Sequence, residues 1–501
     1  MKLRKKQPQP EGISGYDYSD RAARERTADA LFRRAKNART AVEIEWEKYN
    51  DYYNGIHDVT RDLTEFCREN DIPWLPASIP DPYILVESQI EPTVPQPEFR
   101  GRDDDLDSAM AKRREFAVRY IAENNRLSDM NTRNERRLLK LGDAFWKAYW
   151  DEDMRCGEAQ GDIRVSDIPV EAVFPDPAVR GGSVQDGQYL DYVYRIHKVR
   201  FAQVFRADLE ELGITAEEAL GEDYVPRGEI FDMTSALSDT DDTVQVLEHW
   251  FRQPVETSVD GETIPAGAVA CSVQAGGHEL RYIPNYWRRT GAQNTLFPFV
   301  HYWRIQDENR FWNKSELSAV LDLVDAADRK LGAFERQLSL QRHPARGGRR
   351  PGRRRGAYER AGRHRTSQAG THGRRAAPRR TAERWQGGDG YHLVQGADRA
   401  RQPQLRHRHR QGDGARHDRL GPLADGREQA DIKRADRNAG FERLYELLDW
   451  LCLEFFDDDR MLYLGAPEGI RAPGQRMIYN SADFARTLPE VCSLTGEVVR
   501  P

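Results

Sequence analysis

Apolar residues between positions 311 and 340 follow the spacing of an amphipathic α-helix. They recur at alternating steps of three and four residues, which places all of them on one stripe of a helix surface. Charged residues occupy the opposite face, and Ser315 precedes the stripe as a predicted N-cap residue. Because the stripe is narrow, it predicts a long helix with a helical partner. The members of this first stripe are Leu317, Val320, Val324, Ala327, Leu331, Phe334 and Leu338.

A second stripe with the same spacing lies within residues 427–459, which we predict to be a second long helix. The segment between the two helices has a different composition and no apolar periodicity. We therefore expect two long helices that flank an insertion. The members of the second stripe are Phe441, Leu444, Leu448, Leu451 and Phe455.

The pattern ahead of residue 305 predicts a mixed α+β region. Residues 1–20 hold little that could be buried and are expected to be disordered. Beyond residue 143, polar and apolar residues alternate, which predicts β-strands with one or two short helices. The apolar run Tyr83–Val86 lies among prolines and is interpreted as a strand piece or as extended chain packed on a neighbour. Helical spacing predicts helices over residues 20–53, 106–124 and 128–141.

Composition narrows the class of protein. The chain has 501 residues, which predicts roughly two to four domains or one large one. None of its apolar runs approaches the length of about 18 residues that crosses a bilayer. The five cysteines are far apart and form no CxxC pair, which favours buried or incidental thiols in a reducing compartment over a disulfide framework or a zinc site.

The inserted segment, residues 342–426, has a chemistry of its own. Between Arg342 and Leu420 the chain holds 22 Arg, no Lys and 6 acidic residues, a net charge of +16, so the −6 of the whole chain leaves −22 elsewhere. Without Ile, Phe or Met this stretch cannot form an apolar core. It is interpreted as an Arg-rich arm that binds nucleic acid, as a solvated, disordered linker, or as a frame-shift product. We favour the last, because a GC-rich gene read in the wrong frame yields Arg, Gly, Ala, Pro and His.

The sequence lacks the patterns of a catalytic or metal site. The GxxxxGK[ST] and GxSxG motifs are absent. The acidic clusters Asp103–Asp105 and Asp457–Asp459 could hold a divalent cation, but solvated helix ends are the simpler explanation. We therefore predict no enzyme activity, catalytic residue, cofactor or metal, and keep a metal-dependent enzyme acting through these clusters as the weakest alternative. Histidines that stand apart from one another and from every cysteine are His57, His197, His249 and His301.

At four places the sequence resembles the portal, or head–tail connector, proteins of tailed bacteriophages. The first is WEKYNDYYNGIHD at 46–58, and the second joins RLLKLGDAFWKAYWDED at 137–153 to GDIRVSDIPVEAVFPDP at 161–177. The third, FWNKSELSAVLDLVDAADRKLGAF at 311–334, is similar to the start of the portal stem helix. The fourth, REQADIKRADRNAGFERLYELLDWLCLEFFDDDRML at 427–462, is similar to the second stem helix and its exit. Two residues depart from the family pattern, in which Gly is common where Asn313 stands and Asn is common where Asp328 stands.

The resemblance implies an arrangement of domains. Residues 21–305 would form an outer wing of mixed α/β structure, and residues 311–340 and 427–459 would be the two stem helices. Residues 342–426 would stand at the position of the clip, and residues 460–501 would be a truncated C-terminal region. Both apolar stripes would then be buried against neighbouring subunits.

The resemblance also implies a function. Portal proteins form a homo-oligomeric ring, usually a dodecamer, at a capsid vertex, through which double-stranded DNA is packaged and ejected without sequence specificity. The implied partners are terminase, head-completion and capsid proteins, and the implied location is the virion, with the host cytoplasm during assembly and no membrane. The charge of −22 outside the Arg-rich segment suits a channel, since negative walls repel the phosphate backbone. The alternative is a nucleic-acid-binding protein that acts through the Arg-rich arm.

Overall fold

A computed structural model describes most of the chain. The described residues are 16–69, 76–101, 105–156, 159–216, 243–259, 261–291, 294–342, 421–465, 474–484, 491–492 and 498–499. By contacts the chain divides into one unit of Met1–Gln337 with Leu423–Pro501 and a second of Leu338–Pro422. The expectations for residues 1–15 and 343–420, including the Arg-rich segment, therefore lie outside the described residues. The predicted α+β class is confirmed by the mixture of helices and small sheets.

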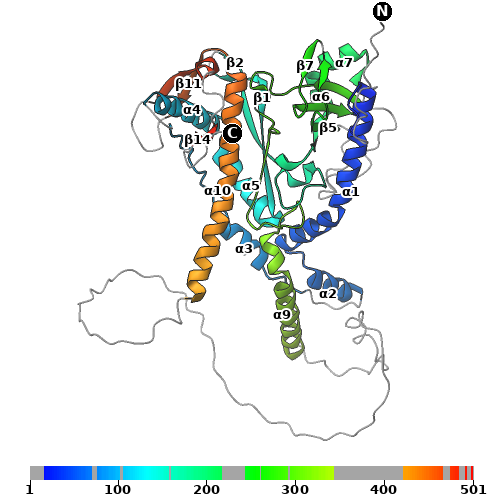
Figure 1. The fold of residues 1–501 in the computed structure, drawn as a ribbon. Coiled ribbons are helices and arrows are strands. Elements are labelled where there is room, and N and C mark those ends of the chain that lie inside the picture. Colours follow the sequence, from blue (N-terminus) through cyan, green and yellow to red (C-terminus); the bar gives the residue numbers. More distant parts are fainter. Residues whose placement is uncertain are drawn as a thin grey trace, which may run out of the picture. The chain divides into compact units, whose positions relative to one another are not determined.

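The early helices begin and end where local signals place them. Asp20 accepts a hydrogen bond from the Ala23 amide at 2.7 Å and caps the first helix, which Asn54 and the left-handed Gly55 terminate. The periodicity of buried residues along this helix is the one that predicted it. These helices are α1 (Arg21–Tyr53), α2 (Asp58–Glu69), α3 (Asp81–Gln89), α4 (Asp105–Asn124) and α5 (Leu127–Leu141) (Figure 1).

Helix α3 corrects the interpretation of Tyr83–Val86 as extended chain. Pro82 lies in its first turn, where the fixed φ of proline suits a helix and the missing N–H costs nothing. Pro82 and Val86, four positions apart, are buried, whereas Tyr83 and Ile84 are about half exposed. The prediction was wrong because four consecutive apolar residues carry no period, and the surrounding prolines favoured an extended chain.

Two antiparallel sheets form the centre of the described part of the chain. One has the strand order β10-β1-β2 and the other β3-β4-β5-β8-β9. The short helices α6 (Lys198–Val204) and α7 (Arg206–Leu212) follow β4. The strands are β1 (Asp143–Cys156), β2 (Ala159–Ile168), β3 (Val173–Pro175), β4 (Tyr189–His197), β5 (Thr243–Arg252), β8 (Val269–Ala275), β9 (His278–Ile283) and β10 (Phe299–Trp303).

Three strand pairs lie outside these two sheets in the described residues, and each is antiparallel. They are β6 (Thr257–Val259) with β7 (Glu262–Ile264), β11 (Arg460–Leu464) with β12 (Gln475–Tyr479), and β13 (Val491–Cys492) with β14 (Val498–Val499). Strand β11 contains the apolar run that the sequence shows after the second stripe.

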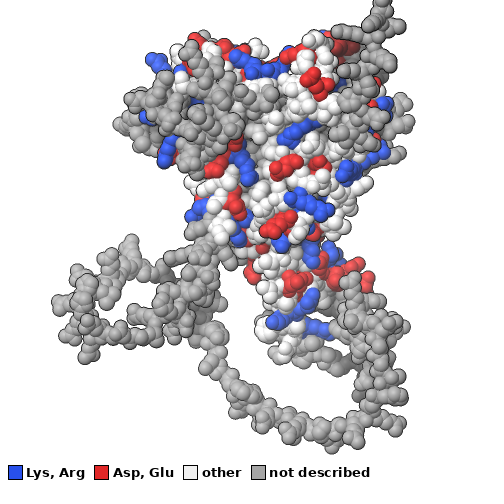
Figure 2. Space-filling model, in the orientation of Figure 1, with Lys and Arg blue, Asp and Glu red and all other residues white. Residues whose placement is uncertain are grey.

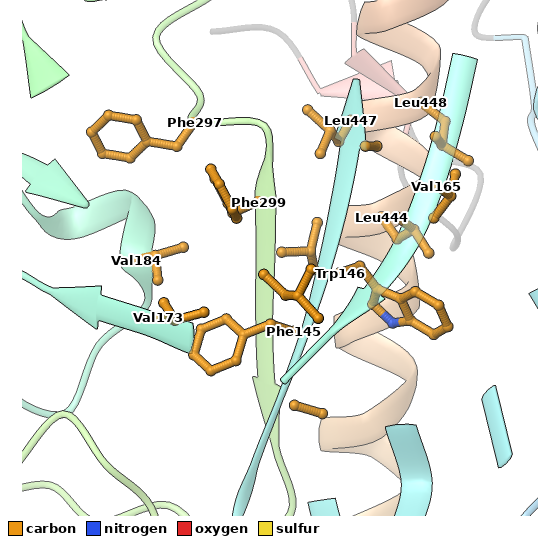
Figure 3. Close-up of a cluster of buried hydrophobic side chains, with 14 of the residues drawn as sticks. Phe145, Trp146, Val165, Val173, Val184, Phe297, Phe299, Leu444, Leu447 and Leu448 are labelled. Carbon is orange, nitrogen blue, oxygen red and sulfur yellow. The ribbon is translucent and has the colours of Figure 1, made fainter. Parts of the chain in front are cut away.

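The long helix α10 (Gly421–Phe455) packs on the three-stranded sheet. Successive residues of β1 point to opposite faces. Phe145 therefore lies toward β3 and Phe299, whereas Trp146 lies toward α10 (Figure 3). Leu444 and Leu448 of α10 lie beside Val165 of β2 on that second face, and all three side chains are buried (Figure 3). The sheet therefore carries apolar side chains on both faces, as a fully covered sheet requires.

A buried ion pair joins the two sheets. The Lys147 ammonium of β1 lies 2.6 and 2.7 Å from the two carboxylate oxygens of Glu248 of β5. The indole N–H of Trp250 donates to the same carboxylate at 2.9 Å. Because both ends of the pair are buried and hydrogen-bonded, removal of either one would leave an uncompensated charge.

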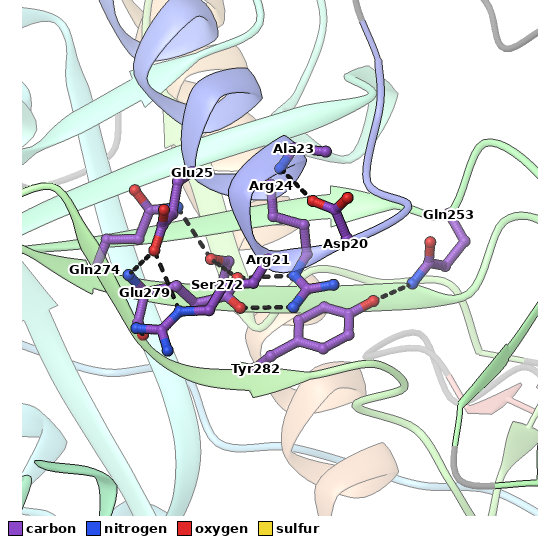
Figure 4. A network of polar contacts seen from close by, with 10 residues as sticks. All are labelled: Asp20, Arg21, Ala23, Arg24, Glu25, Gln253, Ser272, Gln274, Glu279 and Tyr282. Atoms are coloured by element: carbon purple, nitrogen blue, oxygen red, sulfur yellow. Dashed lines mark hydrogen bonds and ion pairs between the residues drawn. The ribbon is translucent and has the colours of Figure 1, made fainter. Parts of the chain in front are cut away.

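The start of α1 is fastened to the edge of the five-stranded sheet. Arg24 makes two parallel hydrogen bonds to the carboxylate of Glu279 on β9, at 2.6 and 2.8 Å, and its guanidinium lies 3.8 Å from the ring centre of Tyr282 (Figure 4). Glu25 accepts the Glu279 backbone N–H at 2.8 Å, and Ser272 donates to the Glu279 carboxylate at 2.6 Å. This network holds α1 to β8 and β9 through charge-assisted bonds.

The helix predicted over residues 311–340 begins later than its apolar spacing indicates. Phe311 and Trp312 are buried in a loop, and Ser315 caps a 3₁₀ turn, η5 (Glu316–Ala319), by accepting the Leu317 N–H at 3.0 Å. The α-helix itself, α9, spans Leu321–Arg342. The Ser315 cap is confirmed, but it starts a tighter turn, because tight packing of this loop on α5 and β1 precedes the helix.

That packing generates a prediction at Gly142, which ends α5 with φ +92°. A Cβ atom there would lie 2.5 Å from the backbone oxygen of Asn313, whereas a Cβ atom at Gly213, where φ is +66°, would have nothing within 4 Å. Gly142→Ala is therefore expected to lower the free energy of unfolding by about 3 kcal/mol or more, and Gly213→Ala by only about 1–2 kcal/mol of left-handed strain. Chemical denaturation of both variants measures the difference, and equal losses would contradict the close approach.

Candidate assembly surface: helices α9 and α10

The second predicted stripe is covered by the chain itself. Phe441, Leu444, Leu448 and Leu451 are buried, and Phe455 is half-buried. Phe441 lies 6.3 Å from Trp146 between ring centres, and Phe455 stacks on Trp150 at 5.3 Å. The C-terminal half of α10 is thus a core helix of this subunit. Its stripe was expected to face another subunit, and the described residues leave little of it for such a contact.

Charged residues on α10 fix the helix against α4 and α5. Arg437 donates to Glu135 of α5 at 2.7 Å and to the Thr93 carbonyl at 2.7 Å. Arg114 of α4 binds Asp449 through both carboxylate oxygens. Burial raises the pKa of Glu135, and the neighbouring Arg437 opposes that rise. Because an ion pair in a buried position tolerates little misalignment, these contacts set the rotation of α10 about its axis.

Hydrogen bonds to the Glu454 carboxylate hold the C-terminal end of α10. The Glu454 carboxylate accepts the backbone N–H groups of Arg289 and Thr290, each at 2.9 Å, and the Thr290 hydroxyl at 2.9 Å. Nearer the middle, Gly440 lies against Tyr302 of β10, and a Cβ atom at that position would be 2.5 Å from the Tyr302 Cβ atom. Glycine at this position therefore allows helix and strand to approach closely.

Helix α9 is buried on a different face from the predicted one. Leu317 and Val324 are buried as expected. Asp325, which the spacing placed on the polar face, is buried too, and so is Asp328, which does not belong to the apolar stripe. Tyr52 donates to Asp325 at 2.6 Å, and a ring nitrogen of His57 lies 2.5 Å from Asp328. Partners distant in the sequence thus bury two carboxylates, which a pattern of apolar residues cannot reveal.

The other edge of the first stripe is exposed. Val320, Ala327 and Leu331 are half-buried, and Phe334 is 58% exposed. The side chain of Leu338 lies outside the described residues. Leu323, which the stripe did not include, is 70% exposed, and at about 100° per residue it points in nearly the same direction as Phe334.

Helix α10 adds Ile432, which is 62% exposed, to these apolar side chains. Lys433, the next residue, pairs with Glu316 of η5 at 2.7 Å. We name the exposed apolar side chains Leu323 and Phe334 of α9 and Ile432 of α10 the α9/α10 apolar set. Sequence spacing identified only Phe334, because the other two fall outside the stripes. In the sequence, Leu323 and Ile432 could have been recognised only as single apolar residues on otherwise charged helix faces.

The histidines that the sequence left isolated have acidic partners. Among the described residues, His57 pairs with Asp328 at 2.5 Å, His249 with Asp191 at 2.6 Å and His301 with Asp143 at 2.8 Å, all fully buried. His197 is exposed and caps α6. The paired residues are 271, 58 and 158 positions apart, so no local motif could have predicted them.

The acidic clusters that the sequence offers as cation sites lie at the surface or outside the described residues. Asp457, Asp458 and Asp459 are exposed and contact Arg289, Arg460 and Asn480 in turn. Asp103 and Asp104 lie outside the described residues, among which no group of three His, Cys, Asp or Glu side chains is placed to hold a metal. A cavity of about 40 Å³ between β10 and α10 is far smaller than a ligand pocket and has room for a few waters.

Comparison with known proteins gives a family match for part of the chain. Residues 85–309 match the model of the phage P22-like portal protein family. The matched range, just under half of the chain, begins within α3, includes both central sheets and stops ahead of α9. No curated protein matches the chain. The resemblance to the portal proteins of tailed phages that the sequence predicts is confirmed over residues 85–309.

The matched family consists of structural proteins. Portal proteins belong to the capsid and its head–tail connection, and they are structural rather than enzymatic. The family implies a multimeric ring at a capsid vertex with DNA passing through it. In the described residues, no helix has both the length and the apolar character that a membrane span requires.

The buried pair on α10 generates a prediction for stability. Arg437→Met leaves the Glu135 carboxylate buried without its cation, so we expect the free energy of unfolding at neutral pH to fall by about 3–5 kcal/mol. Loss of Arg437 raises the pKa of Glu135 further, so the folded state takes up a proton more readily than the unfolded state does. The loss should therefore shrink as the pH falls, which denaturation curves across the acidic range would measure.

Arg434 on the same helix is the matched control. Its side chain is 61% exposed and lies 3.8 Å from Glu91, so Arg434→Met is expected to change the free energy of unfolding by no more than about 1 kcal/mol. A loss in Arg437→Met that is independent of pH, or one no larger than in Arg434→Met, would contradict the role given to the buried pair.

Proposed function

We propose that this chain is a subunit of a portal ring, set at a capsid vertex, through which phage DNA is packaged and ejected. The family match over residues 85–309 carries the proposal. In it, α9 and α10 are the two stem helices, and the sheets with α1 to α7 form the wing. The ring is a homo-oligomer, proposed as a dodecamer, that docks terminase, head-completion and capsid proteins. Assembly takes place in the host cytoplasm, and the function needs no cofactor.

The α9/α10 apolar set supports a contact between subunits. Exposed apolar residues that occur singly are common on monomers. Here two of them, Leu323 and Phe334, lie along one side of a helix, with half-buried Leu331 beside them. Since the stripe of α10 is covered within the subunit, the neighbour is expected to contact this side of α9 and the exposed residue Ile432. The first stripe thus stays a prediction for subunit packing, centred on Phe334 and Leu331.

The charge of the chain supports passage of DNA without binding. Outside the Arg-rich segment the chain carries a net charge of −22. Lys and Arg are interspersed with Asp and Glu over the face shown in Figure 2, where the described residues form no continuous basic patch. DNA-binding surfaces depend on clustered cations that neutralise phosphates, so this distribution favours a channel wall to which DNA does not adhere.

A second candidate function rests on residues 342–420. Their 22 Arg would bind nucleic acid if the segment acts as an arm. Binding of the full chain to duplex and single-stranded DNA, measured against salt concentration, separates the two functions. A steep loss of affinity with salt supports the arm, whereas absence of a salt-dependent complex removes it.

If the chain forms a ring, a single charged substitution in the subunit contact should prevent its assembly. In sedimentation or native mass measurements, the wild-type chain should form a closed oligomer of at least several subunits. Phe334→Asp places a charge in the proposed subunit contact and should shift most of the material to single subunits, since burying an unpaired carboxylate is costly.

Ile44 on α1 provides the control, because it is 65% exposed but lies away from α9 and α10 in the sequence and on another helix. Ile44→Asp should assemble as the wild type does. A wild-type chain that remains a single subunit at high concentration would overturn the ring, whereas equal assembly of both variants would leave the ring but remove Phe334 from its interface.

A further inference from the structure

His57 lies where three parts of the chain meet. It follows α1 and precedes α2, and its ring stacks on Tyr52 with 4.7 Å between ring centres. One ring nitrogen, Nδ1, is 2.5 Å from the Asp328 carboxylate of α9. The same carboxylate accepts the Ile79 backbone N–H at 3.0 Å, in the segment ahead of α3. We call His57, Tyr52, Ile79, Asp325 and Asp328 the His57 cluster.

Both nitrogens of the His57 ring face acceptors. Nδ1 faces the Asp328 carboxylate, and Nε2 lies 3.2 Å from the backbone carbonyl oxygen of Tyr52. A neutral imidazole carries one N–H and can donate only one of these bonds. The imidazolium donates both. The geometry of the ring alone therefore favours the protonated form of His57.

The other buried histidines lack this arrangement. Nε2 of His249 lies 3.0 Å from the Tyr18 hydroxyl, which can donate as well as accept, so a neutral ring satisfies both contacts. Nδ1 of His301 has no hydrogen-bond partner, so a neutral ring bonded to Asp143 satisfies the pair there. Among the three buried His–Asp pairs of the described residues, only the ring of His57 is placed between two acceptors.

The charged groups around His57 also favour its protonated form. From α9 come two buried carboxylates, Asp325 and Asp328. Helix α1 contributes Tyr52 and Lys48. Burial and the contact with Asp325 raise the pKa of Tyr52, so its hydroxyl stays protonated and donates. The Lys48 ammonium lies 5.3 Å from the centre of the Tyr52 ring. From α2 comes Asp58, which pairs with Lys48 at 3.1 Å. With Lys48 held by Asp58, protonated His57 is the cation left for the two carboxylates of α9.

We propose that His57 acts as a proton-dependent fastening of α9: its imidazolium holds the start of α9 to the junction of α1 and α2, and loss of the proton loosens that attachment. The proton carries one hydrogen bond and the charge that compensates Asp328. The attachment is strong where His57 is protonated and Asp328 ionised, and it weakens as rising pH removes the His57 proton. Because α9 bears Leu323 and Phe334, pH would change how firmly that exposed apolar side is held. The proposal concerns contacts within one subunit and does not depend on ring formation.

The test follows two exchange reactions in the full chain by mass spectrometry. Exchange of the imidazole C2 hydrogen reports the protonation of each histidine, and exchange of backbone amides in residues 321–330 reports the attachment of α9. Where C2 exchange shows that His57 loses its proton, amide exchange of α9, corrected for its intrinsic pH dependence, should accelerate about tenfold or more, as expected for loss of a charged hydrogen bond. Its midpoint should coincide with the titration of His57.

Two variants make the result specific. In His57→Gln an amide can still donate to Asp328 but carries no titrating charge, so α9 exchange should be faster than in the wild type and independent of pH. His249→Gln removes another buried His–Asp pair and should leave the pH dependence of α9 unchanged. The proposal is overturned if α9 protection stays constant while His57 titrates, or if His57→Gln keeps the wild-type pH dependence. If His57→Gln fails to fold, coincidence of the two wild-type midpoints decides alone.

Discussion

The burial of charged and apolar side chains together on α10 is the contact on which the described fold depends. One length of this helix presents Leu444 and Leu448 to the three-stranded sheet, and presents Arg437 and Asp449 to Glu135 of α5 and Arg114 of α4. Apolar burial alone would tolerate a rotated or shifted helix, because it is not directional. The ion pairs do not, since a buried charge without its partner is costly. Residues far apart in the sequence are thereby held in one register.

The two halves of α10, and the two sides of α9, differ in how far the rest of the subunit covers them. The C-terminal half of α10 is covered by β1, β2 and β10, and its apolar side chains stabilise the subunit. What remains exposed, at Leu323, Phe334 and Ile432, lies where the helices no longer contact the sheets. The family match ends at residue 309, ahead of both α9 and α10. In the proposed ring, the covered part stabilises each subunit, and the exposed side chains are left for contacts between subunits.

Sequence patterns predicted what depends on local spacing. The ends of α1 and the helices α4 and α5 were predicted from helical periodicity, and the alternation beyond residue 143 predicted strands there. The predicted stripes found the right helices, but they did not show which neighbour covers them: Leu448 is buried within the subunit, and Phe334 is exposed. Apolar spacing indicates that a face will be buried, whereas the identity of the covering surface is a long-range property.

The polar contacts escaped prediction for a related reason, and Asp328 illustrates it. In the portal pattern an Asn is common at this position. An Asn oxygen could accept the Ile79 N–H, and its amide could donate to a neutral imidazole, so that the contact with His57 would involve no charge. The Asp found here keeps the Ile79 bond at 3.0 Å but brings a buried carboxylate that needs a cation, and His57 is the group in contact with it. The Asp328 carboxylate thus joins α9 to a residue 271 positions away in the sequence.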